Sequence, residues 1–361
     1  MTIDPLRSLA ASAITLNHPS TTPQLPLSHP DPRTAQVTPL DAASTPAADR
    51  QHVLAVAKPM ALIVDRLAAN FQLHALDPAT LADVAPQIRG IWASGESRVS
   101  AELIAQLPAL QVIAVMGVGY DGIDVAAAKA RGVVVTHTPD VLNDDVADLA
   151  MGLMLCAARQ LPAADRFVRA GQWPKAPMPL ARKLSGARVG IVGMGRIGQA
   201  IAQRALAFNM CVAYTARSAK PALPWAYWPS AAALAAQSDF LVVITPGGAG
   251  TRKLINAEVL AALGKGQGAG ILVNVARGSV VDEAALIDAL EQGVIAGAGL
   301  DVFENEPQVP ERLRALPQVV LTPHIGSATG QTRQAMADLA YDNLQRGLAG
   351  QTLRTPVPEC R

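Results

Sequence analysis

His324 is the residue of this chain best placed to pass a proton to a substrate. It stands in Leu321-Thr322-Pro323-His324, where the short apolar run at 319–322 predicts a β-strand. Histidine is the usual proton donor near neutral pH because its pKa lies close to the working pH. The chain has six histidines, and the others all precede residue 138. The sequence therefore indicates His324 as the acid that would protonate a carbonyl oxygen during its reduction.

Two glutamates near His324 are candidates to hold its second ring nitrogen. Glu304 and Glu306 both stand in the segment 301–307, shortly before the histidine. A carboxylate that accepts a hydrogen bond from an imidazole fixes its tautomer and raises its pKa, which keeps a proton available for transfer. Spacing alone does not separate the two glutamates, so both stay open at this point.

Arg277 could bind an anionic substrate. Its guanidinium can hold the carboxylate of a 2-oxo acid and polarise the adjacent carbonyl, and the structural alternative is a salt bridge to Asp301 or Asp282. Thr245-Pro246, Arg277-Gly278, Asp301 and His324 each fall at or just after the end of a predicted strand. Ligands of open parallel sheets gather outside the carboxyl ends of the strands. We therefore expect these four segments to meet at one edge.

A hydride donor has its own signature in Gly193-Met194-Gly195-Arg196-Ile197-Gly198. An apolar run at 189–192 precedes it, an alanine-rich helical pattern follows from 199 to about 208, and a second strand is predicted at 211–215, which is the βαβ context that this motif requires. Gly193 and Gly195 permit a tight turn and close approach of a pyrophosphate to the helix N-terminus, and Gly198 lets the helix pack closely on the strand. This context favours dinucleotide binding over a merely structural turn.

The segment after that second strand favours NADPH. An NAD site usually carries an acidic residue about 20 positions after the glycines. Residues 210–220 contain no acidic residue, but they contain Arg217, Ser218 and Lys220. A guanidinium can make two parallel charge-assisted hydrogen bonds to a 2′-phosphate, whereas the alternative is a solvated surface arginine. We predict NADPH as the preferred cofactor, and NADH use stays open.

Composition limits the classes of partner. The 361 residues are 50% hydrophobic and 16% charged with a net charge of +1, which indicates a globular protein of about two domains and argues against nucleic acid or a membrane as partner. The three cysteines form no C-x-x-C and have no histidine at metal-ligand spacing, so we expect no metal and a reducing cytoplasm. Residues 1–51 are rich in Pro, Thr, Ser and Ala and lack a secretory-signal pattern, so we predict a disordered extension.

The rest of the chain alternates strands and helices, which predicts an α/β protein with parallel sheets covered on both faces. The long helical pattern at 143–171 should be divided by Pro162 and could be capped by Asn143 or Asp144. We predict two Rossmann-like doubly wound parallel-sheet domains with an interdomain cleft. The substrate-binding, flavodoxin-like domain would span 52–152 and be completed by 328–361, and the dinucleotide domain would span 153–327.

Several motifs resemble those of one family. GMGRIG, VNVARGSVVDE, GAGLDVFENEP and TPHIGS, in this order and at these spacings, resemble the D-isomer-specific 2-hydroxyacid dehydrogenases over about residues 52–358. GVGYDGID, LNDDVADLAMGLML and the segment 217–220 resemble the NADPH-preferring glyoxylate/hydroxypyruvate and hydroxyphenylpyruvate reductases of that family. The resemblance implies His324 as general acid, Glu306 rather than Glu304 as its partner, and Arg277 as the carboxylate binder.

The resemblance also implies further ligand contacts. Backbone N–H groups of Val118 and Gly119 would hold the substrate carboxylate, and Asp301 would lie near the nicotinamide amide. Substrate selection would depend on the surroundings of Ser94, Gly95, Tyr120 and Trp173, and a homodimer would form through the long connector region. The positions that match cofactor contacts are Arg196, Ile197, Thr245, Pro246, Thr251, Val275, Ala276, Arg277 and Asp301, beside the motif glycines, Arg217 and Ser218.

The leading interpretation is an NADPH-dependent reductase that converts glyoxylate, hydroxypyruvate or a bulkier 2-oxo acid to the D-2-hydroxy acid. An enzyme alternative is an NAD-dependent D-2-hydroxyacid or phosphoglycerate dehydrogenase, although no regulatory extension follows the last predicted helix. An alternative of another class is a dinucleotide-sensing, corepressor-like binding protein. Tight NADPH binding with little turnover would identify that third case.

Overall fold

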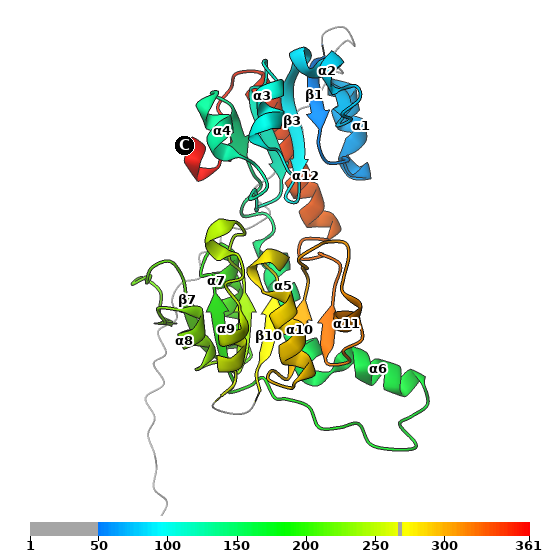
Figure 1. The fold of residues 1–361 in the computed structure, drawn as a ribbon, viewed down its shortest axis with the longest axis vertical. Helices are drawn as coiled ribbons and strands as arrows, with labels where there is room; N and C mark the ends of the chain where they lie inside the picture. The colour runs from blue at the N-terminus through cyan, green and yellow to red at the C-terminus, as the bar shows by residue number, and fades with distance from the viewer. Residues whose placement is uncertain (1–49, 266–268) are drawn as a thin grey trace, which may run out of the picture. The chain divides into compact units, whose positions relative to one another are not determined.

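Residues 50–265 and 269–361 are described by the computed structural model, and two parallel β-sheets organise them (Figure 1). The extension that we predict to be disordered, 1–51, lies outside these ranges except for its last two residues, and Gln51 already begins the first strand. Within the described ranges no helix is long and apolar enough to cross a membrane.

The first sheet has five parallel strands in the order β2-β1-β3-β4-β5. β4 is buried along its whole length, as expected for a parallel strand covered on both faces, and this explains its unbroken apolar sequence. Helix α12 (Gly330–Leu348) packs on this sheet through Leu344 against Gly90 and through Gly347 against Val112. The other elements are β1 (Gln51–Ala55), α1 (Ala61–Asn70), β2 (Phe71–Ala75), α2 (Leu81–Val84), η3 (Ala85–Gln87), β3 (Ile88–Ser94), α3 (Ala101–Gln106), β4 (Val112–Met116), α4 (Val125–Ala130) and β5 (Val134–Thr136).

The second sheet has seven parallel strands in the order β12-β11-β10-β9-β6-β7-β8. The chain runs from β6 to one edge through β7 and β8, then continues from β9 to the other edge, so a topological switch point lies between β6 and β9. The elements are β6 (Arg188–Val192), α7 (Arg196–Ala207), β7 (Cys211–Thr215), β8 (Ala226–Tyr227), α8 (Ala231–Ala235), β9 (Phe240–Val243), η4 (Ala249–Thr251), α9 (Ala257–Ala262), β10 (Ile271–Asn274), η5 (Gly278–Val280), α10 (Glu283–Glu291), β11 (Gly297–Leu300), α11 (Glu311–Arg314) and β12 (Val319–Leu321).

This topology confirms the predicted α/β fold class with doubly wound parallel sheets. Strands β9, β10, β11 and β12 are neighbours and run in the same direction, so their carboxyl ends share one edge. Thr245, Arg277, Asp301 and His324 follow those four ends in turn. Strand β8 was not predicted, because a strand of two residues is too short to show a hydrophobic period.

The predicted long helix at 143–171 is in fact two helices, α5 (Asn143–Arg159) and α6 (Leu161–Arg169) (Figure 1). The break is at Gln160, whose φ of 51° is left-handed, and Pro162 lies in the first turn of α6, where a missing N–H costs no helical hydrogen bond. The predicted cap of Asn143 or Asp144 was wrong. The N-cap is Leu142, which makes no side-chain cap bond, and the helix already begins at Asn143; the Asn143 side chain donates to Asp140, and Asp144 pairs with an arginine of α7.

Candidate active site

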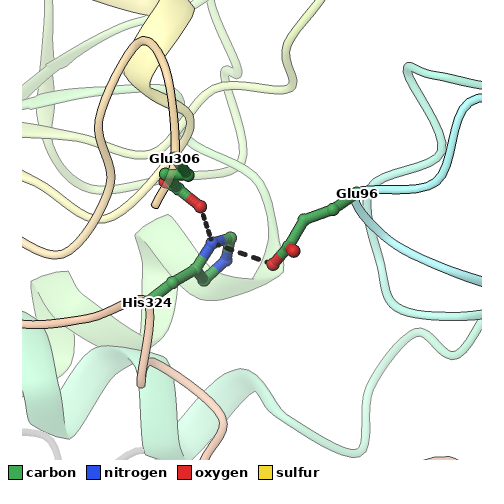
Figure 2. Close-up of side chains that lie close together, drawn as sticks. All are labelled: Glu96, Glu306 and His324. Atoms are coloured by element: carbon green, nitrogen blue, oxygen red, sulfur yellow. Dashed lines mark hydrogen bonds and ion pairs between the residues drawn. The ribbon is translucent and has the colours of Figure 1, made fainter. Parts of the chain in front are cut away.

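The imidazole of His324 is held by Glu306 (Figure 2). Nδ1 of His324 lies 2.7 Å from Oε2 of Glu306, and Oε1 of the same carboxylate accepts a 2.9 Å hydrogen bond from the Phe303 N–H. Since a carboxylate only accepts, Nδ1 carries the proton in this pair. Glu304, which spacing left open, lies instead 3.7 Å from Nη2 of Arg252.

The pKa values of the pair favour a protonated imidazole beside an ionised carboxylate. The hydrogen bond to Glu306 raises the pKa of His324 above its ordinary value and outweighs burial, which acts to lower it. Burial acts to raise the pKa of Glu306, but its bonds to His324 and to the Phe303 N–H leave that pKa below its ordinary value. Nε2 of His324 has no partner among the described residues and can donate its proton to a substrate.

Asp301 fixes the loop that carries His324. One carboxylate oxygen accepts from the Thr322 hydroxyl at 2.7 Å and from the Ile325 N–H at 2.8 Å, and the other accepts from the Gly326 N–H at 2.8 Å. Burial raises the pKa of Asp301 although these three bonds act to lower it. Its observed hydrogen bonds thus all go to the loop that carries His324, and a contact between Asp301 and the nicotinamide stays a prediction.

Arg277 connects the two sheets at their strand ends. Its Nε lies 3.2 Å from Oδ1 of Asp121, and its Nη2 lies 3.4 Å from the Gly95 carbonyl oxygen. The structure therefore contains neither of the salt bridges considered from the sequence, to Asp301 or to Asp282. Asp121 was missed by the sequence analysis, although its place in the N-terminal glycine loop was a signal.

The glycine loop after β4 presents unused donors beside Arg277. A Cβ at Gly119 would overlap the guanidinium, so only glycine allows this approach. The Val118 carbonyl accepts from Nδ1 of His137 at 3.0 Å, which holds the loop in place. In the part of the chain that the structure describes, the N–H groups of Val118 and Gly119 donate to nothing. The loop and the guanidinium together form a fitting site for a carboxylate.

The glycine motif lies at the switch point of the second sheet. Gly193 has a φ of 105°, and a Cβ there would meet the Ile244 carbonyl. A Cβ at Gly198 would meet the Gly193 carbonyl, so this glycine lets α7 begin close to the turn. A Cβ at Gly195, the N-cap of α7, would meet no other atom. The open side of Gly195 at a helix N-terminus fits a pyrophosphate group.

The remaining predicted cofactor residues lie around this turn or on the next strand ends. Arg196 begins α7, and its Nε lies 2.9 Å from Oδ1 of Asp140. The Thr251 hydroxyl donates to the Pro246 carbonyl at 2.7 Å and closes the loop after β9. The buried Thr245 hydroxyl has no partner in the described ranges. Val275 and Ala276 are buried after β10, and Ile197 is half-buried in α7.

Arg217 and Ser218 are both exposed on the loop after β7. The buried Tyr214 holds this loop, because its hydroxyl accepts from the Lys220 N–H at 2.7 Å. The hydroxyl also lies 3.4 Å from the Lys220 carbonyl oxygen and can donate to it. A phosphate could therefore approach the guanidinium from solvent on a loop of fixed shape.

Glu96 is a second residue that the sequence analysis missed. Its Oε1 lies 3.1 Å from Nδ1 of His324 (Figure 2). The signal was its place directly after β3, where the strand-end rule applied to the second sheet also holds for the first. Glu96, Glu306 and His324 place three potential metal-ligand atoms within 4.8 Å of one another, yet Nδ1 is already engaged by its hydrogen bond to Glu306.

Tyr120 and Trp173, two positions expected to select the substrate, make no contact with His324 among the described residues. The Tyr120 hydroxyl donates to Oε2 of Glu359 at 3.1 Å; burial, and secondly this bond, raise the pKa of Tyr120 to about 12. Trp173 is 68% exposed. Ser94 and Gly95 precede Glu96: the Ser94 hydroxyl accepts from the Glu96 N–H at 3.3 Å, and the Gly95 carbonyl oxygen lies 3.4 Å from Nη2 of Arg277.

Comparisons with known proteins give a consistent result. The sequence model of the D-isomer specific 2-hydroxyacid dehydrogenase NAD binding domain matches residues 151–326. The chain is 47% identical over 277 residues to a hydroxyphenylpyruvate reductase of Plectranthus scutellarioides, covering 77% of this chain and 88% of the relative. It is 47% identical over 270 residues to a glyoxylate/hydroxypyruvate reductase of Arabidopsis thaliana, covering 75% of this chain and 85% of the relative.

A solved structure is similar as well. The NADPH-dependent glyoxylate/hydroxypyruvate reductase of Sinorhizobium meliloti, crystallised with NADP and malonate, superposes with a TM-score of 0.80 at 45% identity. The alignment covers 86% of this chain and 98% of that one.

Proposed function

Because the chain belongs to the D-isomer-specific 2-hydroxyacid dehydrogenase family, we propose that it reduces small 2-oxo acids to D-2-hydroxy acids with NADPH, glyoxylate and hydroxypyruvate being the first candidates. The observation that carries this proposal is the 2.7 Å pair of His324 and Glu306 on the strand-end edge that also carries Arg277. The names of the relatives support the substrates, and the NADP complex of the Sinorhizobium meliloti structure supports the cofactor.

The mechanism assigns each step to a described group. The substrate carboxylate would bind Arg277 and the free N–H groups of Val118 and Gly119. Asp121 holds Nε of Arg277, and Nη1 and Nη2 each donate one N–H to a backbone carbonyl, of Ala276 and Gly95, so each keeps one N–H for the substrate. Nε2 of His324 would protonate the carbonyl oxygen, and Glu306 stabilises the charged imidazole before transfer. A bound NADPH supplies the hydride.

The glycine turn and the loop after β7 would hold the cofactor. Gly193, Gly195 and Gly198 would receive the pyrophosphate, and Arg217 with Ser218 would receive the 2′-phosphate. Loss of NADPH absorbance on addition of glyoxylate or hydroxypyruvate tests the function directly. Tight NADPH binding with no turnover of either acid would overturn it in favour of a dinucleotide-sensing protein.

Removing the arginine of this loop is expected to weaken NADPH use selectively. In Arg217→Ser, kcat/KM for NADPH should fall about 10- to 100-fold, since a charge-assisted pair with phosphate is lost, while kcat/KM for NADH stays nearly constant. Initial rates with both cofactors at fixed hydroxypyruvate measure the ratio. An equal loss with both cofactors would contradict phosphate recognition by Arg217.

Replacing Glu306 with glutamine is expected to move the loss of reductase activity to lower pH. Reduction needs protonated His324, so kcat/KM is high below the pKa of His324 and falls as pH rises through it. The bond to Glu306 is the main cause that raises the pKa of His324. In the variant, burial and the charge of Arg277 act to lower this pKa, and only the weaker influence of Glu96 still raises it. On the alkaline side kcat/KM should fall about tenfold or more.

The pH profile of kcat/KM for glyoxylate measures this shift. Glu304→Gln is the matched control, because Glu304 lies near Arg252 instead of His324. If the pH profile of kcat/KM shifted equally in Glu306→Gln and Glu304→Gln, the shift would be a general effect of lost charge. Glu306 would then not be the residue that raises the pKa of His324.

We also propose a cytoplasmic homodimer with the domain division 52–152 plus 328–361 and 153–327. The packing of α12 on the first sheet supports grouping 328–361 with 52–152. Leu161, Val168, Trp173 and Leu180 are exposed apolar side chains in or after α6, which supports a dimer contact in this connector region. The three cysteines are free thiols, which supports a reducing compartment.

A further inference from the structure

Glu96 lies in a turn whose backbone is fixed by two serines. The Ser97 hydroxyl accepts from the Ser94 N–H at 2.8 Å, and the Ser94 hydroxyl lies 3.3 Å from the Glu96 N–H, which donates to it. The turn follows β3, which neighbours β1 at the switch point of the first sheet. The backbone position from which the Glu96 side chain extends is therefore set by the local fold.

Glu96 approaches the imidazole without being needed to orient it. Its Oε1 lies 3.1 Å from Nδ1 of His324, while Glu306 engages the same nitrogen at 2.7 Å (Figure 2). One N–H cannot serve two acceptors fully, and Glu306 is the shorter and more buried partner. The side chain of Glu96 is 64% exposed, against 24% for Glu306. Part of the Glu96 carboxylate thus remains available to another group.

The turn contacts both groups that the mechanism assigns to the substrate. Gly95 contacts Arg277 through its carbonyl oxygen, and Glu96 contacts His324. The carboxylate and the carbonyl of a 2-oxo acid are on adjacent carbons. A substrate that binds Arg277 and His324 together therefore uses only these two carbons to do so. Its third substituent then extends toward the loops around these two groups, and residues 95–96 touch both of them, Gly95 at Nη2 of Arg277 and Glu96 at Nδ1 of His324.

The charged side chains around Arg277 and His324 include more carboxylates than cations. Glu96, Glu306 and Asp121 face the cations Arg277 and His324, and the first carboxylate of a substrate adds another negative charge. A second substrate carboxylate would approach Glu96 with no cation assigned to it. A neutral hydroxyl could instead donate a hydrogen bond to the Glu96 carboxylate.

We infer that Glu96 is a specificity-determining residue that rejects 2-oxo acids with a second carboxylate and favours substituents that are neutral or donate a hydrogen bond. This inference rests on the proposed reductase function. It places glyoxylate and hydroxypyruvate among the accepted substrates and dicarboxylic 2-oxo acids among the rejected ones.

The test compares two substrates of matched shape and different charge. Oxaloacetate and 4-methyl-2-oxopentanoate differ mainly in the replacement of a carboxylate by an isopropyl group. In Glu96→Gln, which keeps the size of the side chain, the ratio of their kcat/KM values should rise about tenfold in favour of oxaloacetate, because one like-charge contact is lost. Effects on His324 act on both substrates and cancel in the ratio.

Controls separate this inference from the proposed function. Glu102→Gln removes an exposed carboxylate of the neighbouring helix α3 and should leave the ratio unchanged. If the wild-type enzyme reduces glyoxylate but Glu96→Gln leaves the ratio unchanged, the inference on Glu96 is overturned and the proposed function stands. If the wild-type enzyme reduces no 2-oxo acid with NADPH, the proposed function itself is overturned.

Discussion

His324→Ala is expected to lower kcat/KM for glyoxylate and hydroxypyruvate by about 10²–10⁴-fold, the usual contribution of a positioned general acid. The reason is specific to the described geometry. Nε2 is the free donor of an imidazole whose pKa is raised by Glu306, so its removal leaves only water to protonate the developing alkoxide. Steady-state rates of NADPH oxidation measure the loss.

NADPH affinity and folding should change little in this variant, because His324 lies 28% exposed in a loop after β12 and not in the glycine turn. Fluorescence titration with NADPH and a thermal unfolding curve check this. His74→Ala is a matched control, since His74 hydrogen-bonds His52 in the first sheet and should keep wild-type rates. Wild-type kcat/KM in His324→Ala would remove the histidine from the mechanism.

Arg277→Ala is expected to lower kcat/KM by about 10²–10⁴-fold, mainly through a higher KM, because the variant loses the cation that binds the substrate carboxylate. The loss should exceed that of an ordinary ion pair, since Asp121 is then left without its 3.2 Å partner and repels the incoming anion. Initial rates over a wide range of hydroxypyruvate concentration separate KM from kcat.

Arg277→Lys should recover only part of this loss, because an ammonium keeps the charge but lacks the planar fork that binds a carboxylate and Asp121 together. Arg312→Ala is the control, since Arg312 pairs with Asp288 and Glu291 on an exposed helix surface. Full recovery in the lysine variant would show that charge alone suffices and would exclude bidentate recognition.

The glycine turn and the ends of the buried strands were predictable from the sequence, because they depend on residues that are neighbours in the chain. The turn at Gly193 was predictable because a φ of 105° favours glycine whatever surrounds it, whereas Gly195 has an ordinary φ and an open side that a pyrophosphate could approach. The positions of Arg277, Asp301 and His324 at strand ends were predictable because an apolar run marks where each buried strand stops. The parallel order of those strands then places the three residues on one edge.

Short elements and helix ends were harder to predict. A single residue in a left-handed conformation, Gln160, divides α5 from α6, and nothing in its residue type requires that conformation. Helix α5 begins after Leu142, which offers no capping side chain, while Asn143 contacts Asp140 and Asp144 pairs with Arg204. These outcomes depend on packing, which a local pattern does not contain.

Only the tertiary structure decided which charged groups meet. Glu304 and Glu306 have the same side chain two residues apart, and the path of the loop after β11 brings Glu306 to His324 and Glu304 near Arg252. Asp121 and Glu96 reach Arg277 and His324 across long separations in the chain, so neither contact leaves a trace in spacing. The sequence by itself predicted the glycine turn and the strand-end positions of Arg277 and His324. The fold determined which carboxylates lie beside them, because Glu306 is brought there by the path of the loop after β11, and Asp121 and Glu96 come from strand ends of the other sheet.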